Sequence, residues 1–406
     1  MKSVTMLRLA LWLLGPLAVA NAAANGPNDS VGNGAFSRWQ DFDAYQWLEV
    51  KPSHPRDAWS PRAGLQAVEL RRDFYVMGGR TPLAIPGVPG ASQIWNDVWR
   101  SDDRGVTWSQ LPDAPWSARA YFQAVTRGGT MFVLGGQNFK AGPACPPGIP
   151  SCSDFFNDVW SSPDGVRWKR ETANAGWSAR AGLSAVVHKG AIYVLGGSVN
   201  DDTAIIGGPP ARIYFNDVWK SYDGRKWTRL TKSAPWKPRA GAVVVTKGEW
   251  IYLLGGEEGF VCLPGGPCPP YFNDVWRSRD GARWERVTAA AGWSPRPGHQ
   301  CEVIVGSIVC FGGFGLPPQG NPQDIWVSAN GRDWEQVAGT PWNSTAPEQI
   351  KYDFAALASW DWDKGPLPAI YTFGGDRETF DFTDPLNPFR VDNDVWRFSP
   401  PSPTGR

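Results

Sequence analysis

The apolar residues of this chain fall into short runs separated by turn residues, and no segment keeps the period of about 3.6 residues that marks an amphipathic helix. Residues 182–230 are representative. Lys189-Gly190 separates the first two runs there, and Asp223-Gly224, a pair typical of a tight turn, separates the last two. The pattern predicts four short antiparallel strands, over 182–188, 192–195, 214–221 and 226–230.

The same unit recurs six times. Its most regular marker is a Gly-Gly doublet after an apolar run, and successive doublets lie 57 to 62 residues apart: Gly78-Gly79, Gly135-Gly136, Gly196-Gly197, Gly255-Gly256, Gly312-Gly313 and Gly374-Gly375. An Asn-Asp-Val-Trp motif or a close variant follows each doublet, ending at Trp99, Trp160, Trp219, Trp276, Trp326 and Trp396. Another tryptophan precedes each first strand, at Trp59, Trp116, Trp177, Trp236, Trp293 and Trp342. Repetition at such a period indicates one supersecondary unit used many times.

Six four-stranded sheets predict an all-β fold, a single six-bladed β-propeller over residues 39–398, because twisted sheets arranged as a ring bury their faces on their neighbours. The many tryptophans, 24 in all, suit such packing. A lone fourth-strand pattern (45–50) precedes the first unit, and the chain ends just after a third strand (393–398). We therefore expect the N-terminal strand, with Trp47, to complete the last blade beside Trp396 and to remove an open sheet edge.

The aliphatic run ending in Gly-Gly, the preceding Pro-Arg-Ala-Gly type of turn and the downstream tryptophan resemble kelch repeats over essentially all of residues 39–398. The hairpin between the third and fourth strands is similar to the Asp box of sialidase-type propellers. Residues 101–108 fit that pattern closely, and 162–165, 221–224 and 278–281 are one residue shorter. Asp boxes are structural hairpins and do not imply sialidase activity. The kelch resemblance implies, most often, a binding or interaction module.

Residues 1–22 have the pattern of a signal peptide. Lys2 and Arg8 are its positive region, residues 9–20 are its apolar region, and Ala20-Asn21-Ala22 is a small-x-small cleavage site. An uncleaved anchor is the alternative, but the apolar region is short for that. No later stretch reaches the roughly 18 apolar residues of a membrane span. We expect a secreted or periplasmic protein, without a membrane span and monomeric.

Charge and histidine content argue against several classes of partner. Lys and Arg number 40 against 39 Asp and Glu, a net charge of +1, so binding of nucleic acid through a general basic surface is not expected. The three histidines, His54, His188 and His299, fall on different units, which argues against a copper site. We expect no metal and no cofactor.

The six cysteines of an exported chain predict disulfides. Cys145 and Cys152 bracket one Pro/Gly-rich loop, and Cys262 and Cys268 bracket another. Cys301 and Cys310 lie on the first two strands of the fifth unit and face each other if Val305-Gly306 is a two-residue turn. We predict three local disulfides, with free buried thiols or a metal site as the alternative.

One face of the predicted propeller carries the long, irregular loops between second and third strands: 80–94, 137–154, 198–212, 257–270, 314–322 and 376–391. A rigid scaffold with variable loops on one side is where binding sites usually lie. A repeated arginine precedes each first strand of units one to five, at Arg62, Arg119, Arg180, Arg239 and Arg296, and Lys351 takes this place in unit six. Because it recurs in every unit, we favour pairing with repeated aspartates such as Asp97 and Asp158 over a cationic ligand ring.

A ligand site is better sought where the units differ. The residue after Gly-Gly varies, and the candidates there are Arg80, Gln137, Glu257 and Asp376. The start of the first strand adds Tyr121, His299 and Asp353, where other units place Gly or an apolar residue. Glu257, Asp376 and Asp353 could act as acid and base, Arg80 could hold an anion, and Tyr121 or Gln137 could position it. The alternative is a polar, wetted rim.

Two functions therefore stand at this point. The first is a binding module that holds protein or glycan on the long-loop face. The second is a carbohydrate-active enzyme such as a sugar epimerase or mutarotase, since exported kelch-like sialic-acid epimerases resemble this chain in compartment and architecture. Two carboxylates converging within about 5–10 Å over the central mouth would favour the enzyme.

Overall fold

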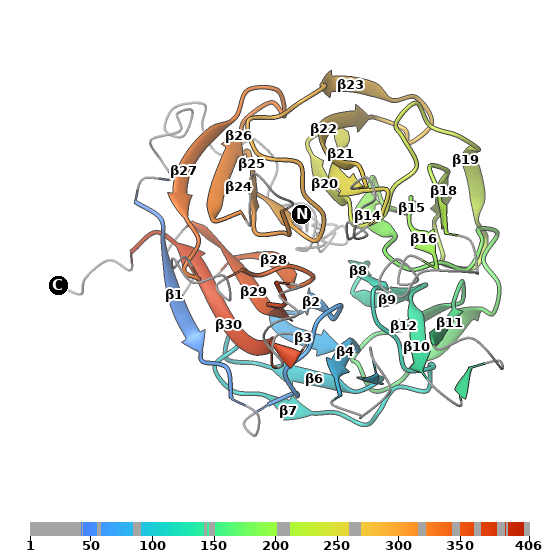
Figure 1. Cartoon of the computed structure of the whole chain (residues 1–406). Coiled ribbons are helices and arrows are strands. Elements are labelled where there is room, and N and C mark those ends of the chain that lie inside the picture. The colour runs from blue at the N-terminus through green and yellow to red at the C-terminus, as the bar shows by residue number, and fades with distance from the viewer. Residues whose placement is uncertain are drawn as a thin grey trace, which may run out of the picture.

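The computed structural model of the chain forms a ring of six β-sheets around a central axis (Figure 1). It describes residues 42, 44–54, 58–83, 91–141, 144–145, 151–200, 212–259, 269–315, 322–342, 350–360, 367–379, 386 and 389–401. Each sheet has four antiparallel strands, and the described residues contain essentially no helix. The predicted all-β, six-bladed propeller is confirmed.

The first strand of each blade lies nearest the axis and the fourth lies at the outer edge (Figure 1). Blade one consists of β2 (Gln66–Leu70), β3 (Asp73–Met77), β6 (Val98–Ser101) and β7 (Ser109–Gln110). Blade two consists of β8 (Gln123–Arg127), β9 (Thr130–Leu134), β12 (Val159–Ser162) and β13 (Lys169–Thr172). Blade three consists of β14 (Ser184–His188), β15 (Ala191–Leu195), β18 (Val218–Ser221) and β19 (Thr228–Thr231). Blade four consists of β20 (Val243–Lys247), β21 (Trp250–Glu257), β22 (Tyr271–Ser278) and β23 (Glu285–Thr288). Blade five consists of β24 (Gln300–Ile304), β25 (Ser307–Phe311), β26 (Asp324–Ser328) and β27 (Glu335–Gly339). Blade six is β28 (Ala355–Trp360), β29 (Pro368–Asp376), β30 (Val391–Ser399) and β1 (Gln46–Lys51).

The long loops between second and third strands begin and end as short ribbons in three blades. These ribbons are β4 (Arg80–Pro82) with β5 (Ser92–Ile94), β10 (Gln137–Ala141) with β11 (Ser151–Phe155), and β16 (Ser198–Val199) with β17 (Ile213–Tyr214). The ribbons start at the residue after Gly-Gly, so they continue each blade onto the long-loop face.

The ring is closed by the start of the chain. Strand β1 pairs with β30 in antiparallel register, with Trp47 opposite Phe398 and Glu49 opposite Trp396. Trp47 packs in one cluster with Phe398, Trp342 and Trp396. The two ends of the propeller are therefore tied within one sheet, as the sequence predicted, and β30 is not left as an open edge.

Tryptophans fill the spaces between the blades. The tryptophan before each first strand is almost fully buried. In blades one to five it meets, edge to face, the tryptophan that directly precedes the fourth strand, and in blade six Trp342 meets Trp47 of β1 at a tilted angle of 54°. Trp59 with Trp108 and Trp116 with Trp168 have ring centroids 4.6 and 5.8 Å apart at interplanar angles of 83° and 88°. Such a geometry places the positive ring edge on the negative ring face.

The repeated arginines are structural. Arg62, fully buried, makes two hydrogen bonds to the Asp97 carboxylate, at 2.6 and 2.9 Å, and a third to the Gly78 carbonyl. Its backbone N–H donates to Asp392 of blade six, so one residue ties two blades together. The same pairing recurs as Arg119–Asp158, Arg180–Asp217, Arg239–Asp274, Arg296–Asp324 and Lys351–Asp394. No charge is left over for a cationic ligand ring.

The Asp-box hairpins are closed by their own side chains. In blade two the Ser162 hydroxyl accepts from the Gly165 N–H, and Asp164 accepts from the N–H groups of Val166 and Arg167. Trp168 then donates to the Gly165 carbonyl. The box of blade one is one residue longer, and the additional residue, Arg104, reaches Glu69 and the Ser359 hydroxyl, both at 2.8 Å. This side chain therefore bridges blades one and six.

Two of the three predicted disulfides lie among the described residues. Cys145 pairs with Cys152, and Cys301 pairs with Cys310 at directly opposed positions of β24 and β25. Cys262 and Cys268 lie outside the described part of the chain, as do residues 1–22, so the third disulfide and the signal peptide remain predictions. In the described segments no helix has the length and apolar character that crossing a membrane requires.

Candidate functional site

A ring of six backbone positions surrounds the axis at the start of the first strands. Its members all have positive φ: Gly64, Tyr121, Gly182, Gly241, Gly298 and Asp353. Backbone hydrogen bonds of 2.8–3.1 Å link them from blade to blade; for example, Tyr121 N–H donates to Gly64 and Gly182 N–H donates to Tyr121. Four units place glycine here, which tolerates this conformation without strain. Tyr121 and Asp353 hold it at φ +53° and +50°, a strained arrangement that often accompanies function.

The residues after Gly-Gly form a second circle beside this ring. In five units this residue exchanges backbone hydrogen bonds with the residue that precedes a ring position, as Arg80 does with Ala63 and Asp376 with Tyr352. In unit five Phe314 only donates to the Pro297 carbonyl, because proline has no N–H. The circle contains Arg80, Gln137, Ser198, Glu257, Phe314 and Asp376. The fold thus brings the varying residues of all six units to one place, the central mouth of the long-loop face.

Three of these side chains make direct contact. The Arg80 guanidinium donates from Nε to the Tyr121 hydroxyl at 2.7 Å and from a terminal nitrogen to Asp376 Oδ2 at 2.6 Å. The Arg80 side chain is 20% exposed and that of Asp376 is 2% exposed. Because the three residues come from blades one, two and six, the contact depends on closure of the ring. We call this set, together with Tyr352, Asp353 and Glu378, the mouth cluster.

Burial governs the protonation of the mouth cluster. It raises the pKa of Asp376, and the Arg80 charge opposes this shift. Burial, with the charge of Asp376, also raises the pKa of Glu378 to about 7. The backbone N–H of Glu378 donates to Asp376 Oδ1 at 2.9 Å. The negative charge of Asp376 disfavours ionisation of the Glu378 carboxyl group, because like charges oppose each other.

The two tyrosines of the mouth cluster stay protonated at neutral pH. Burial is the main cause that raises the pKa of Tyr121, with Arg80 opposing it, and burial with the charge of Asp376 raises that of Tyr352. The Tyr352 ring meets Phe314 edge to face at 5.3 Å. The cluster therefore offers hydroxyl groups, carboxyl groups and aromatic surface, while its single guanidinium is already paired.

The structure distributes the candidate residues unevenly. It brings Arg80, Tyr121 and Asp376 into contact, and Asp353 acts electrostatically on Tyr121. Glu257 lies across the axis in blade four, with its Oε1 3.4 Å from where a Cβ on Gly241 would stand. Gln137 is buried at the start of β10. Sequence reasoning missed Tyr352, Phe314 and Glu378.

His299 lies elsewhere. It follows the ring residue Gly298 and occupies the position that Leu65, Phe122 and Phe354 fill in other units. Its side chain is 1% exposed and packs on Trp293 with ring centroids 5.4 Å apart. Burial, helped by the nearby Arg296 charge, lowers its pKa to about 3. We therefore place His299 in the packing between blades and leave it out of the mouth cluster.

Comparison with known proteins supports the fold. No protein-family model matches the chain. A kelch repeat protein, M-T8 of Myxoma virus (strain Lausanne), is 27% identical over 222 residues, which are 54% of this chain and 35% of that protein. The chain is a six-bladed β-propeller that is similar in sequence to this kelch repeat protein. The matched region spans about a third of the length of the viral relative.

A solved structure resembles most of the chain. It is titled "Structure of YjhT", with a TM-score of 0.58, 16% sequence identity, and coverage of 85% of this chain and 96% of that one. At that identity the likeness concerns the fold alone.

Proposed function

We propose that this propeller is a binding module that holds a glycan or protein ligand at the central mouth of its long-loop face, through the mouth cluster. The observation that carries the proposal is the contact of Arg80, Tyr121 and Asp376. These residues come from three blades and break the repeat, whereas the structural arginines repeat with it. A bound ligand has no sixfold symmetry, so departures from symmetry at the axis are where recognition is expected. Kelch-type propellers are commonly binding modules, which agrees with this assignment.

The charge of the mouth cluster restricts the ligand. Arg80 is neutralised by Asp376, and Glu378 and Asp353 add acidic groups, so the cluster is acidic when ionised. The earlier expectation that Arg80 holds an anion is therefore not carried into this proposal. Neutral hydroxyl groups, which can donate to carboxylates and accept from Tyr121, fit this chemistry. Among the two ligand classes a neutral glycan is preferred.

The test is a binding screen with neutral, acidic and amino sugars, followed by isothermal titration calorimetry of each hit. We expect Asp376→Asn and Tyr121→Phe to weaken binding about tenfold or more, because the first replaces a buried carboxylate acceptor with a neutral amide and the second removes a buried hydroxyl group. Glu249→Gln, an exposed residue of the opposite face, is the matched control and should bind as wild type does. Unchanged affinity in both mouth variants would remove the site assignment.

The second candidate, a sugar epimerase or mutarotase, is favoured by one observation. Burial and the charge of Asp376 raise the pKa of Glu378 to about 7, and a carboxyl group with such a pKa can both accept and donate a proton at neutral pH. The assay is polarimetry or proton NMR of anomer and epimer interconversion. If Glu378→Gln abolishes turnover while binding persists, the propeller is an enzyme; if no hit turns over, it is a binding module.

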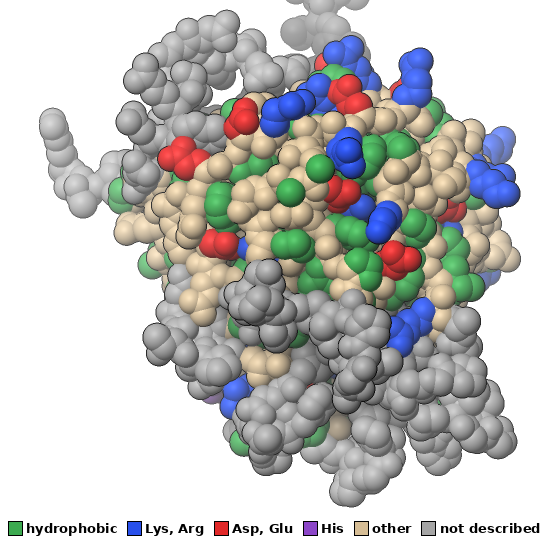
Figure 2. Space-filling view, turned by 45° about the horizontal axis from the view of Figure 1, so that its top comes forward, with side chains coloured by type: hydrophobic (Ala, Val, Ile, Leu, Met, Phe, Trp, Pro, Cys, Tyr) green, Lys and Arg blue, Asp and Glu red, His purple; other side chains and the backbone are tan. Residues whose placement is uncertain are grey.

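We also propose that the protein is exported and works in an oxidising compartment. The disulfides Cys145–Cys152 and Cys301–Cys310 are compatible with this, because disulfides persist mainly outside the cytosol. On the side drawn in Figure 2, basic and acidic side chains are interspersed, which fits a partner other than nucleic acid. Mass spectrometry of the secreted protein should place its N-terminus directly after Ala22.

A further inference from the structure

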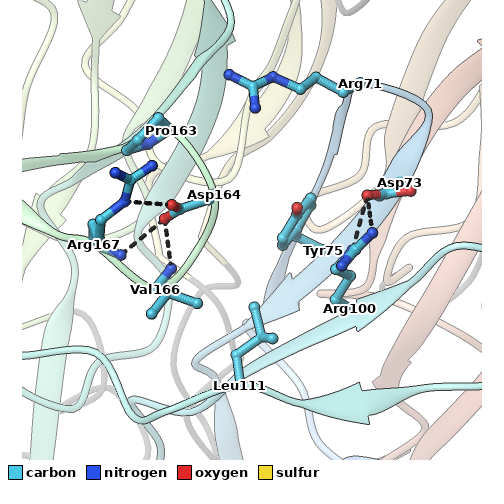
Figure 3. Close-up of a pocket in the computed structure, with 9 residues that line it drawn as sticks. All are labelled: Arg71, Asp73, Tyr75, Arg100, Leu111, Pro163, Asp164, Val166 and Arg167. Carbon is cyan, nitrogen blue, oxygen red and sulfur yellow. Dashed lines mark hydrogen bonds and ion pairs between the residues drawn. The ribbon is translucent and has the colours of Figure 1, made fainter.

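A cavity of about 490 Å³ lies between blades one and two on the face opposite the mouth cluster. Tyr75, Arg100 and the β2–β3 turn with Arg71 form one wall, and the Asp box of blade two, with Asp164 and Val166, forms the other. Figure 3 shows the two walls facing each other across the gap. The volume falls in the range of ligand pockets, about 300–1,000 Å³.

The residues that line this cavity include one more positive side chain than negative side chains. Arg100 pairs with Asp73 at 2.7 Å, and Arg167 pairs with Asp164 at 2.6 Å. Partial burial acts to raise the pKa of Asp164, but hydrogen bonds from Arg167 and Val166 outweigh it and lower the pKa to about 2, so this carboxylate stays ionised and occupied. Arg71 lines the cavity and forms no ion pair with any described residue. The lining therefore carries three positive and two negative groups, a net charge of +1.

The turn that carries Arg71 is held in a costly conformation. Arg71 and Arg72 have φ of +55° and +74°, in the left-handed region that residues with side chains disfavour. The equivalent turns of other blades include glycine, as Gly128-Gly129, Lys189-Gly190 and Val305-Gly306. Blade one thus keeps two arginines where the fold favours glycine, and strain of this kind points to function.

The remaining lining is aliphatic. Val166 is 46% exposed beside Leu111. At the corresponding positions of the next seam, Arg225 and Glu171 form an ion pair that joins blades two and three. The Tyr75 ring lies under Gly165, whose Cβ would stand 3.0 Å from it, so it offers its hydroxyl rather than a face for a sugar to stack on. A carboxylate with an aliphatic neighbour matches this surface.

We propose that this cavity binds an acidic peptide segment of a partner protein, with a Glu or Asp carboxylate on Arg71 and an adjacent aliphatic side chain on Leu111 and Val166. The Tyr75 hydroxyl, whose pKa burial and Asp73 raise, remains a donor to the carboxylate. The site is separate from the mouth cluster and does not depend on the function proposed for it.

The test is fluorescence polarisation of the labelled peptide Gly-Ser-Leu-Glu-Leu-Ser-Gly on the purified full chain. We expect saturable binding that weakens with added salt, and binding that is weaker by up to about fivefold for the Arg71→Gln variant and for the peptide with Gln in place of Glu. Arg72→Gln, next to Arg71 but outside the cavity lining, is the matched control and should bind normally.

A second variant separates binding from folding. Arg71→Asn with Arg72→Gly installs a favoured turn pair, so it should raise the melting temperature while it loses peptide binding. No saturable binding, equal binding by Arg71→Gln and wild type, or binding of glucuronate without binding of the peptide would each overturn the proposal.

Discussion

Tyr121 and Asp353 adopt a backbone conformation that the other four ring positions give to glycine. Both departures were visible in the sequence, because an aligned repeat shows which unit differs at which position. The repeat pattern did not show which residue of each unit occupies the ring position. His299, which follows the ring residue Gly298, was therefore grouped with Tyr121 and Asp353. The side chain of His299 alternates to the packed side, where it meets Trp293.

Distances were the other part that the sequence could not supply. Arg80 and Asp376 are 296 residues apart in the chain and meet only because blade six lies next to blade one. Glu378 follows Asp376 in a loop without repeat counterparts, so no pattern marked it. A raised pKa depends on burial, which a residue type at a rim does not reveal.

The first prediction concerns pH and Glu378. An acid whose pKa is higher in the folded than in the unfolded protein holds its proton more tightly when folded. Its contribution to stability is present below the unfolded pKa and is lost as pH rises through about 7. Because Glu378 is partly exposed, we expect a loss of about 1–2 kcal/mol between pH 5 and 8. Urea unfolding across this range should be flatter for Glu378→Gln; an equally steep dependence would contradict the shift.

The second prediction concerns the repeated buried pairs. Asp217→Asn leaves the fully buried Arg180 without its charge partner, and removing one member of a buried pair costs about 3–5 kcal/mol. Chemical denaturation measures the loss. Glu249→Gln, which breaks the exposed pair with Lys189, should cost less than about 1 kcal/mol. Similar losses in the two variants would show that the Arg180 pair is not a structural clamp.

At the scale of elements, each blade is a local four-stranded sheet whose turn chemistry the sequence displays, so strand order and hairpins were predictable. Irregular features depended on single insertions. The additional residue in the Asp box of blade one was visible as a length difference, but its role became clear only from Arg104, which contacts both Glu69 and Ser359. The interface between the first and last blades is thus stabilised by hydrogen bonds of Arg104, which comes from an insertion in blade one.

The third prediction tests that seam. Arg104→Ala removes hydrogen bonds to Glu69, Ser359 and the Trp360 carbonyl and leaves the Glu69 carboxylate buried without its partner. We expect a loss of about 2–4 kcal/mol in unfolding free energy. Hydrogen exchange should show the change first in β2 and β28. Arg283→Ala in the exposed Asp box of blade four is the control, with little change expected.

At the scale of the whole molecule, the sequence predicted both the number of blades and the way the ring closes. Six doublets fixed the count, and a lone outer-strand pattern at one end matched a missing outer strand at the other. The contact between Arg80 and Asp376 in the mouth cluster depends on this closure, because Arg80 lies in blade one and Asp376 in blade six.

The fourth prediction concerns closure. Trp47→Ala opens a space among Phe398, Phe311 and Trp342, and such truncations of large aromatics cost about 3–5 kcal/mol. The melting temperature of the variant should be lower than that of the wild type. Its apparent glycan affinity should also be lower if less of the protein is folded. Leu48→Ala, on the exposed side of the same strand, should change little. A Trp47 variant as stable as wild type would mean that β1 does not secure the ring.

The most direct measurement is a crystal structure of the protein with a ligand obtained from the glycan screen. We predict electron density for the ligand over the axis, within hydrogen-bond distance of Tyr121 and the Asp376 carboxylate. Density only at the rim of the blades or on the opposite face, with the mouth cluster unchanged and empty of ligand, would contradict the assignment.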